Sequence, residues 1–244
     1  MLYARALETP KKSVDVWYWQ TREVGESVRG AAEALLNDTE KARQKRLQLP
    51  SAKDEFCLSR YMLRTCLSTY CDVAATEWRF KDNVYGKPEI SYPSLSEPLA
   101  FNLSHTLHGI ALAVSSIDEV GIDLEHTERR ASILEIAERF YSTREYNEIG
   151  MLPRDDGRRR FFEYWTLRES YVKARGLGAA LLFAHLAFHI DRGGHVCLAP
   201  NPALNDDVSG WHFQLMSPEK RHVMALALRA KGRQPIVTTR HFNP

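Results

Sequence analysis

The sequence predicts an α+β protein from the order of its strand-like and helical segments, and its composition and charge place it among ordinary globular chains. Short runs of β-branched and aromatic residues alternate with amphipathic stretches of helical period. Hydrophobic residues make up 44% of the 244 positions and charged residues 26%, which is an ordinary globular composition. Lys and Arg number 33 against 31 Asp and Glu, a net charge of +2, and no window approaches the roughly 20 apolar residues of a membrane span. We therefore expect no nucleic-acid partner recognised by overall charge and no contact with a membrane.

The first half of the chain is predicted to begin with a strand, continue with helices and return to strands. Asn37 and Asp38 supply N-cap chemistry for the second of these helices, and Phe56, Leu63 and Leu67 lie on the inward face of the third. The expected elements are a strand over 14–19, helices over 31–36, 39–49 and 52–70, a long Gly- and Pro-rich loop over 83–98, and strands over 100–103 and 109–114.

The second half is predicted to run from a strand through three helices to four short strands. Ser142 and Glu145 form a capping box at the start of the second helix, and Gly176 suits a left-handed C-cap at the end of the third. The expected elements are a strand over 120–125, helices over 132–140, 143–151 and 161–175, and strands over 187–190, 195–198, 211–216 and 222–228. No low-complexity linker or repeat of letters divides the chain.

The cysteines and the first residues bear on the compartment. The four cysteines form no Cys-x-x-Cys pair and no zinc spacing, so structural thiols are expected. Residues 1–12 lack the apolar core of a signal peptide. A reducing, cytoplasmic location is the expectation.

Two carboxylates stand out in the predicted strand over 120–125. Because side chains alternate along a strand, Asp123 and Glu125 share one face, about 7 Å apart along the strand axis. Two such groups repel each other unless a cation lies between them, and hard oxygen ligands favour Mg²⁺. A solvated acidic face of an ordinary amphipathic strand is the alternative.

The predicted helix over 161–175 is too apolar for a surface helix, yet it carries charged groups. Arg168, Glu169 and Lys173 lie among aromatic and aliphatic residues, with Glu169 and Lys173 one turn apart. Buried charges are costly unless they are paired or bind a ligand. The residues therefore indicate either an internal ion pair or a ligand site.

Three further groups are candidates for anion binding. Ser104 and His105 end a strand and present a hydroxyl and an imidazole, Lys87 stands between a glycine and a proline, and basic residues that include Arg43 and Arg46 crowd one helix end. Each has an ordinary interpretation as a turn or a solvated charged face. A Ser-His hydrolase is disfavoured, because adjacent strand residues point apart and the Gly-x-Ser-x-Gly elbow is missing.

In chain order, Gly-Lys-Pro, Phe-Asn-x-Ser-His, Gly-Ile-Asp-x-Glu and Trp-x-x-Arg-Glu-Ser-x-x-Lys resemble the signature of the 4'-phosphopantetheinyl transferases. The match is to the long, single-chain, surfactin-synthetase-activating type and runs from Gly86 to about Leu181. The resemblance implies two similar α/β halves, 1–119 and 120–244, related by a pseudo-twofold axis. Each half would pack a small antiparallel sheet with a long helix, and coenzyme A would lie between them.

The resemblance also implies a reaction: transfer of the 4'-phosphopantetheine arm of coenzyme A to a serine of an apo acyl or peptidyl carrier protein, with release of adenosine 3',5'-bisphosphate. The site residues that it implies fall into three sets. Mg²⁺ would be held by Asp123, Glu125 and Glu169. The catalytic groups would be Glu169 as the first candidate base, Glu145 as the second, and Lys173 on the pyrophosphate. The nucleotide end would be bound by Lys87, Ser104, His105, Arg43 and Arg46.

This sequence departs from the family pattern at Arg168, where the family usually has lysine. Arg158, Arg159 and Arg160 are a candidate docking site for an acidic carrier, although three arginines before a helix can simply be solvated. A monomer is expected. Two rival functions stay open, a non-catalytic coenzyme A or nucleotide-binding module and a Mg²⁺-dependent phosphodiesterase that uses water.

Overall fold

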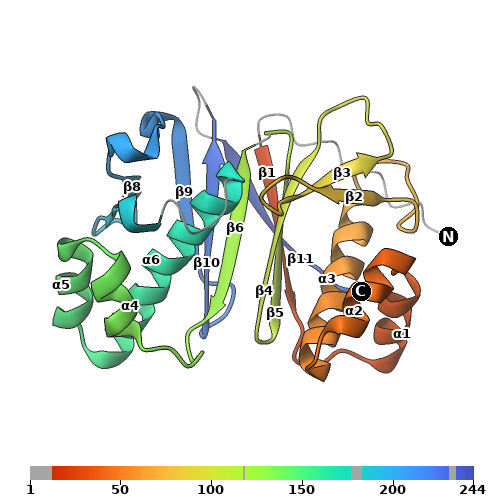
Figure 1. The fold of residues 1–244 in the computed structure, drawn as a ribbon, viewed down its shortest axis with the longest axis horizontal. Coiled ribbons are helices and arrows are strands. Elements are labelled where there is room, and N and C mark those ends of the chain that lie inside the picture. The colour runs from red at the N-terminus through yellow and green to blue at the C-terminus, as the bar shows by residue number, and fades with distance from the viewer. Residues whose placement is uncertain (1–12, 118, 177–182, 231–234) are drawn as a thin grey trace.

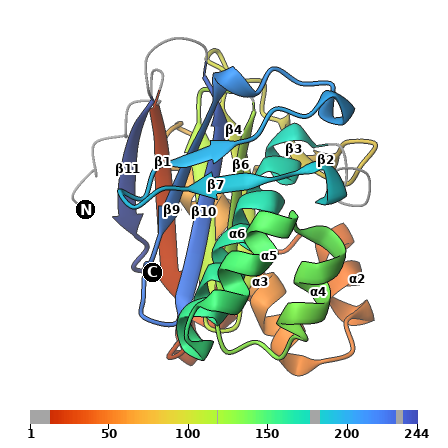
Figure 2. The same cartoon turned by 90° about the vertical axis from the view of Figure 1, so that its left-hand side faces the viewer.

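The computed structural model describes residues 13–117, 119–176, 183–230 and 235–244. Residues 1–12 and the predicted end of the motif region at Leu181 therefore lie outside the described residues. Figure 1 shows the strands gathered in the middle of the molecule, with one group of helices on each outer flank. Figure 2 shows the same layers from the side of α4, α5 and α6. The predicted mixture of helices and strands is confirmed.

Two sheets form the centre. The first has the order β11-β1-β5-β4, in which β1 pairs antiparallel with β5 and parallel with β11. The second has the order β6-β10-β9 and is antiparallel. The strands are β1 (Ser13–Gln20), β4 (Ala100–Thr106), β5 (Gly109–Ser115), β6 (Val120–His126), β9 (Trp211–Met216), β10 (His222–Arg229) and β11 (Ile236–His241), with two short hairpins of β2 (Arg79–Asp82) with β3 (Pro88–Tyr92) and β7 (Phe188–Ile190) with β8 (Val196–Leu198).

Each sheet is covered on its outer side by one long helix and two shorter ones (Figure 1). The helices are α1 (Glu26–Ala34), α2 (Asp38–Arg46) and α3 (Pro50–Leu67) beside the first sheet, and α4 (Ile133–Phe140), α5 (Thr143–Met151) and α6 (Arg154–Arg175) beside the second. The 3-10 turns η2 (Phe183–His185), η3 (Pro202–Leu204) and η4 (Val208–Gly210) follow α6. The expected capping box of Ser142 and Glu145 and the left-handed C-cap at Gly176 are both present.

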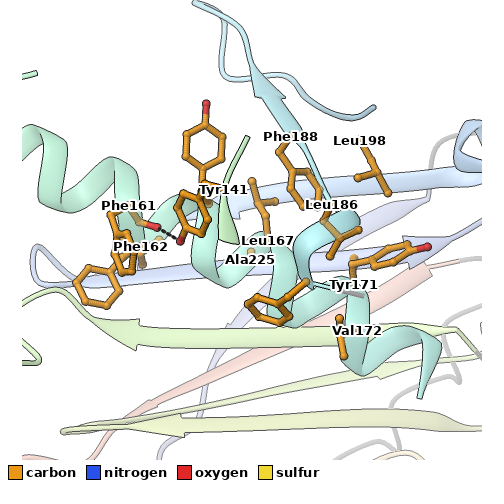
Figure 3. Close-up of a cluster of buried hydrophobic side chains, with 14 of the residues drawn as sticks. Tyr141, Phe161, Phe162, Leu167, Tyr171, Val172, Leu186, Phe188, Leu198 and Ala225 are labelled. Carbon is orange, nitrogen blue, oxygen red and sulfur yellow. Dashed lines mark hydrogen bonds between the residues drawn. The ribbon is translucent and has the colours of Figure 1, made fainter. Parts of the chain in front are cut away.

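The core has three parts that follow these layers. One apolar cluster fills the space between α3 and the first sheet, and a second lies between α6 and the second sheet. Figure 3 shows the second cluster, in which Phe161 of α6 lies beside Phe162 and Tyr141, and Phe188 and Leu198 lie over the later turns of the helix. The third cluster joins the inner faces of the two sheets, where Val16 and Ile122 are members. Alternate residues of β6 thus face the opposite sheet, and the intervening ones face α6.

Several elements differ from the expectations. The loop predicted over 83–98 contains β3, while β2 and β11 were not predicted. The first helix covers 26–34 rather than 31–36, and the second ends at Arg46. The long helix begins at Arg154 rather than at 161, because its charged first turns are stabilised by ion pairs such as Arg160 with Glu148 and Glu163. The first turns of this helix consist mostly of charged residues, so they have no hydrophobic periodicity from which a helix could be predicted.

The expected division at 119/120 falls between β5 and β6, but the chain crosses back at its C-terminal end. Strand β11 pairs with β1 and so completes the sheet of the first half. Among the described residues, no helix is both long and apolar enough to cross a membrane. Cys57 and Cys66 are buried, and Cys197 is exposed.

Candidate active site

The two carboxylates of β6 lie under α6, on the face opposite to the contact between the sheets. Asp123 is 4% and Glu125 8% exposed. Gly121 allows α6 to approach the strand this closely, because a Cβ atom at this position would lie 2.0 Å from the carbonyl oxygen of Ser170. The Gly-Ile-Asp-x-Glu motif therefore combines a close helix contact with two shielded acidic groups.

Helix α6 brings Glu169 and Lys173 to the same place. The Nζ atom of Lys173 donates to Asp123 Oδ1 at 2.6 Å and to Ser104 Oγ at 3.0 Å. Ser104 comes from β4 of the other sheet and donates in turn to Asp123 Oδ1 at 2.9 Å. The predicted metal-site carboxylates and Lys173 are thus brought together from one strand and one helix, and Ser104 joins them from a second strand.

The electrostatics of the site reflect this crowding. Burial, followed by repulsion from Asp123, raises the pKa of Glu125 and of Glu169 to about 7. Arg129 and Lys173 oppose the shift in both groups. Arg129 also forms an ion pair with Glu125. The three acidic groups are therefore close enough to repel one another, and a cation among them would relieve that repulsion.

The two carboxylate oxygens of Asp123 differ in their hydrogen bonds. Its Oδ2 atom is buried and has no hydrogen-bond partner, whereas Oδ1 accepts from Ser104 and Lys173. Within the described ranges, no three His, Cys, Asp or Glu side chains stand ready to hold a metal ion as they are oriented. Arg129 pairs with Glu125, and Lys173 pairs with Asp123 through Oδ1 only.

A cavity of about 300 Å³ opens beside Glu169 and Lys173 and is walled by residues 85–88, β4 and the end of α6. Lys87, predicted to contact the nucleotide, lies in this wall. Its Nζ atom donates to the carbonyl oxygens of Ala174 at 3.0 Å and Val120 at 3.3 Å. Asn83 of the same hairpin donates to Gly176 O at 3.4 Å. Lys87 therefore joins the β2–β3 hairpin to the other half of the molecule.

A second, basic pocket of about 260 Å³ lies between α2, α3 and β2. Arg43, Arg60 and Arg79 line it together with Glu40 and Asp82, and Arg60 Nε lies 3.7 Å from Glu40 Oε1. The guanidinium carbons of Arg43 and Arg60 lie 5.6 and 5.4 Å from the ring centre of Phe56. His105 is not among the residues that line this pocket, and its Nδ1 atom lies 3.4 Å from Oε2 of Glu55 on α3. Of the two arginines predicted to bind the nucleotide end, Arg43 lines this pocket. Arg46 is exposed on the last turn of α2 and does not line it.

Two predicted site residues have other roles. The Ser104 hydroxyl donates to Asp123 and accepts from Lys173 and Leu124, which is its whole capacity, so it has nothing left for the nucleotide phosphate. Glu145 is fully buried, and its Oε2 atom lies 2.6 Å from Arg168. The carboxylate of Glu145 also caps its own helix and accepts from Phe188 N. A carboxylate enclosed in this way does not contact a substrate, so the prediction of Glu145 as the second candidate base is corrected to a structural role.

The arginines at the start of α6 also have partners within the chain. Arg158 donates to the carbonyl oxygens of Thr127 and Arg129, and Arg159 donates to Ser217. Arg160 pairs with Glu148. These contacts fix the side chains against neighbouring segments, and the ion pairs of Arg159 with Glu163 and of Arg160 with Glu148 and Glu163 offset part of their charge, while Arg158 meets only neutral oxygens.

Some residues of the site were missed by sequence reasoning. Arg129 lies on a turn after β6 and Arg79 begins a short strand, so nothing in the sequence placed these two at a site, whereas Arg60 follows the basic residues at the end of α2 and was part of that basic cluster. Asn102 and Thr106 did leave a signal, because with Ser104 they form an alternating polar set in a strand whose other residues are mostly apolar.

Comparisons with known proteins agree with this geometry. A model of the 4'-phosphopantetheinyl transferase superfamily matches residues 119–227, which include β6 and α6. The 4'-phosphopantetheinyl transferase HetI of Nostoc sp. is 32% identical over 83% of this chain and 82% of its own length. The 4'-phosphopantetheinyl transferase Sfp of Bacillus subtilis is 30% identical over 58% of this chain and 60% of its own length.

Among solved structures, the holo-acyl-carrier-protein synthase of Neisseria meningitidis is 20% identical. Its alignment covers 47% of this chain and 99% of that chain, with a TM-score of 0.39. Since the Nostoc relative matches more than four fifths of both chains, and since the family motifs meet at one site, this chain belongs to the 4'-phosphopantetheinyl transferase superfamily.

Proposed function

We propose that the protein transfers the 4'-phosphopantetheine arm of coenzyme A to a serine of an apo acyl or peptidyl carrier protein and releases adenosine 3',5'-bisphosphate, with Mg²⁺ as cofactor. Family membership supports the transferase activity. The observation that carries the site assignment is the meeting of Asp123, Glu125 and Glu169 with Lys173 beside one cavity. The attack of a hydroxyl on a phosphorus atom demands this combination of charge neutralisation and positioning.

The residues fit a magnesium ion in donor chemistry. Asp123, Glu125 and Glu169 offer only oxygen, which Mg²⁺ prefers, and the buried Oδ2 atom of Asp123, which has no hydrogen-bond partner, fits the role of a metal ligand. When bound, the ion would neutralise negative charge on the pyrophosphate. Binding of the ion through Asp123 Oδ2 would leave the contact of Lys173 with Oδ1 in place, whereas Arg129 would compete with the ion for Glu125.

The chain's own groups account for the remaining chemistry. Lys173 has a side chain that is 28% exposed and lies at the cavity, so its ammonium group can turn from Asp123 to the pyrophosphate oxygens. Glu169 faces the same cavity, and its pKa of about 7 suits a group that accepts a proton from the serine hydroxyl near neutral pH. Metal binding lowers the basicity of a carboxylate. Glu169 would take the proton of the serine hydroxyl either directly or through one intervening water molecule.

We propose that the basic pocket receives the phosphate at the nucleotide end. Arg43 and Arg60 lie against the ring of Phe56, and Arg79 adds a third guanidinium. Planar guanidinium groups match phosphate oxygens well. His105 has a side chain that is 47% exposed, but its Nδ1 atom lies 3.4 Å from Glu55 Oε2, so binding of a phosphate there would compete with this carboxylate.

The two-half architecture with a pseudo-twofold axis is also a proposal, and a matched pair of buried contacts supports it. Glu40 in the capping box of α2 lies 2.8 Å from Arg64 of α3, and Glu145 in the capping box of α5 lies 2.6 Å from Arg168 of α6. Both arginine side chains are fully buried. Because one chain supplies both halves, we propose that the protein acts as a monomer, which light scattering can test.

The experiment measures the mass gain of apo carrier proteins incubated with coenzyme A and Mg²⁺. Asp123→Asn should lower the transfer rate by about 100-fold or more, while the matched control Asp155→Asn, an exposed residue in the first turn of α6, should keep it. Full activity of Asp123→Asn would refute the metal assignment. Free phosphopantetheine formed without a carrier would identify a phosphodiesterase, and binding without any turnover would identify a coenzyme A-binding module.

A further inference from the structure

Strands β4 and β6 face each other across the boundary between the two sheets, although each is the last strand of its own sheet. An edge strand carries a row of backbone N–H groups that must find acceptors when they are buried. All seven residues of β6 are buried. The outward N–H groups of β6 therefore need hydrogen-bond acceptors from outside its own sheet.

Side chains of β4 supply these acceptors. The N–H groups of Ile122, Leu124 and His126 donate to Asn102 Oδ1 at 2.8 Å, Ser104 Oγ at 3.2 Å and Thr106 Oγ1 at 3.2 Å, respectively. Successive N–H groups of an antiparallel strand point alternately to its two sides, so these three share the side away from β10. We call Asn102, Ser104 and Thr106 the side-chain ladder.

The ladder residues have the same spacing along β4 as the outward amides have along β6. Their side chains emerge on one face of β4 at intervals of two residues, the same interval at which β6 presents its outward amides. A backbone-to-backbone pairing would merge the two sheets into one and bring the strands to about 4.8 Å. The ladder keeps the sheets distinct while it satisfies the buried donors.

The ladder also reaches the acidic site. Each of the carboxylates at Asp123 and Glu125 stands between two residues whose amides the ladder holds. Ser104 in addition donates to Asp123 Oδ1 and accepts from Lys173. The register of β6 and the direction of its carboxylates are thus tied to the other half of the molecule through these contacts.

We propose that the side-chain ladder fixes the position of β6 across the boundary and that Asn102, Ser104 and Thr106 are positioning residues for the carboxylates. The positioning role rests on the proposed function, but the ladder itself does not. Thr106 is the informative member, because its hydroxyl contacts His126 N and its side chain lines neither the cavity nor the basic pocket.

The experiment compares Thr106→Val, which removes the acceptor at nearly constant size, with Thr106→Ser, which keeps it. Thr127→Val is the matched control, since this hydroxyl lies just beyond β6 and donates to Arg221 O at an exposed position. Amide hydrogen exchange, Mg²⁺ affinity by calorimetry, and kcat and KM for coenzyme A are measured on the full chain.

In Thr106→Val, the amide of His126 should exchange about tenfold faster or more. Mg²⁺ affinity and kcat should each fall by about tenfold, the usual effect of losing a group that orients a metal ligand, with KM for coenzyme A unchanged. Thr106→Ser should restore all three values. Unchanged exchange at His126 would refute the ladder, and faster exchange with unchanged Mg²⁺ affinity would refute the positioning role. An inactive wild-type protein would refute the proposed function alone, because exchange and calorimetry need no turnover.

Discussion

Replacing Glu145 by glutamine tests whether this residue is structural or catalytic. In the native protein its carboxylate meets Arg168 at 2.6 Å, and both side chains are 0% exposed. The substitution leaves the Arg168 guanidinium buried without a counter-charge, which usually costs about 3–5 kcal/mol. The amide oxygen can still accept hydrogen bonds, so we expect a loss near 3 kcal/mol. At about 2–4 °C per kcal/mol for a chain of this size, the melting temperature should fall by about 6–12 °C.

Thermal unfolding followed by circular dichroism measures this loss, and the transfer assay is run well below the lowered midpoint. We expect kcat per folded molecule to stay close to the native value, because Glu145 does not reach the cavity. A base that acts on the substrate contributes about 10²–10⁴-fold. A fall in kcat of that size with an unchanged melting temperature would show that the structural interpretation of Glu145 is wrong.

Two controls accompany this variant. Glu138→Gln changes an exposed glutamate on neighbouring α4 and should alter the free energy of unfolding by less than about 0.5 kcal/mol. The double variant Glu145→Gln with Arg168→Met removes both charges, so it should be more stable than Glu145→Gln alone. Equal losses in the single and double variants would mean that the unpaired guanidinium is not the cause.

Two further variants test the contacts that build the cleft. Gly121→Ala would place a Cβ atom 2.0 Å from Ser170 O, so chemical denaturation should show a loss of about 3 kcal/mol or more, whereas Gly150→Ala, which meets nothing within 4 Å, should not destabilise. Lys87→Met removes the donor to Ala174 O and Val120 O, so the free energy of unfolding should fall by about 1–3 kcal/mol even without coenzyme A. A change confined to KM for coenzyme A would instead assign Lys87 to the nucleotide.

Elements with a strong local signal were predictable. β1 and β6 combine β-branched, aromatic or aliphatic residues, and α5 carries its own capping box, so local chemistry determines them. Strands β2 and β11 are short or polar and were missed. Their pairing depends on partners elsewhere in the chain, and β11 lies more than 200 residues from β1.

Local periodicity determined two separate pairs, because the alternation of a strand places Asp123 with Glu125 and the turn of a helix places Glu169 with Lys173, and only the family resemblance predicted that the two pairs form one site. The tertiary structure decided which of the other polar groups belong to that site. It put Ser104 against Asp123 and enclosed Glu145 with Arg168, since a hydrogen-bond partner from a distant element is chosen by packing and not by spacing along the chain. Periodicity gives the face on which a side chain lies, but only the folded chain supplies what that face meets.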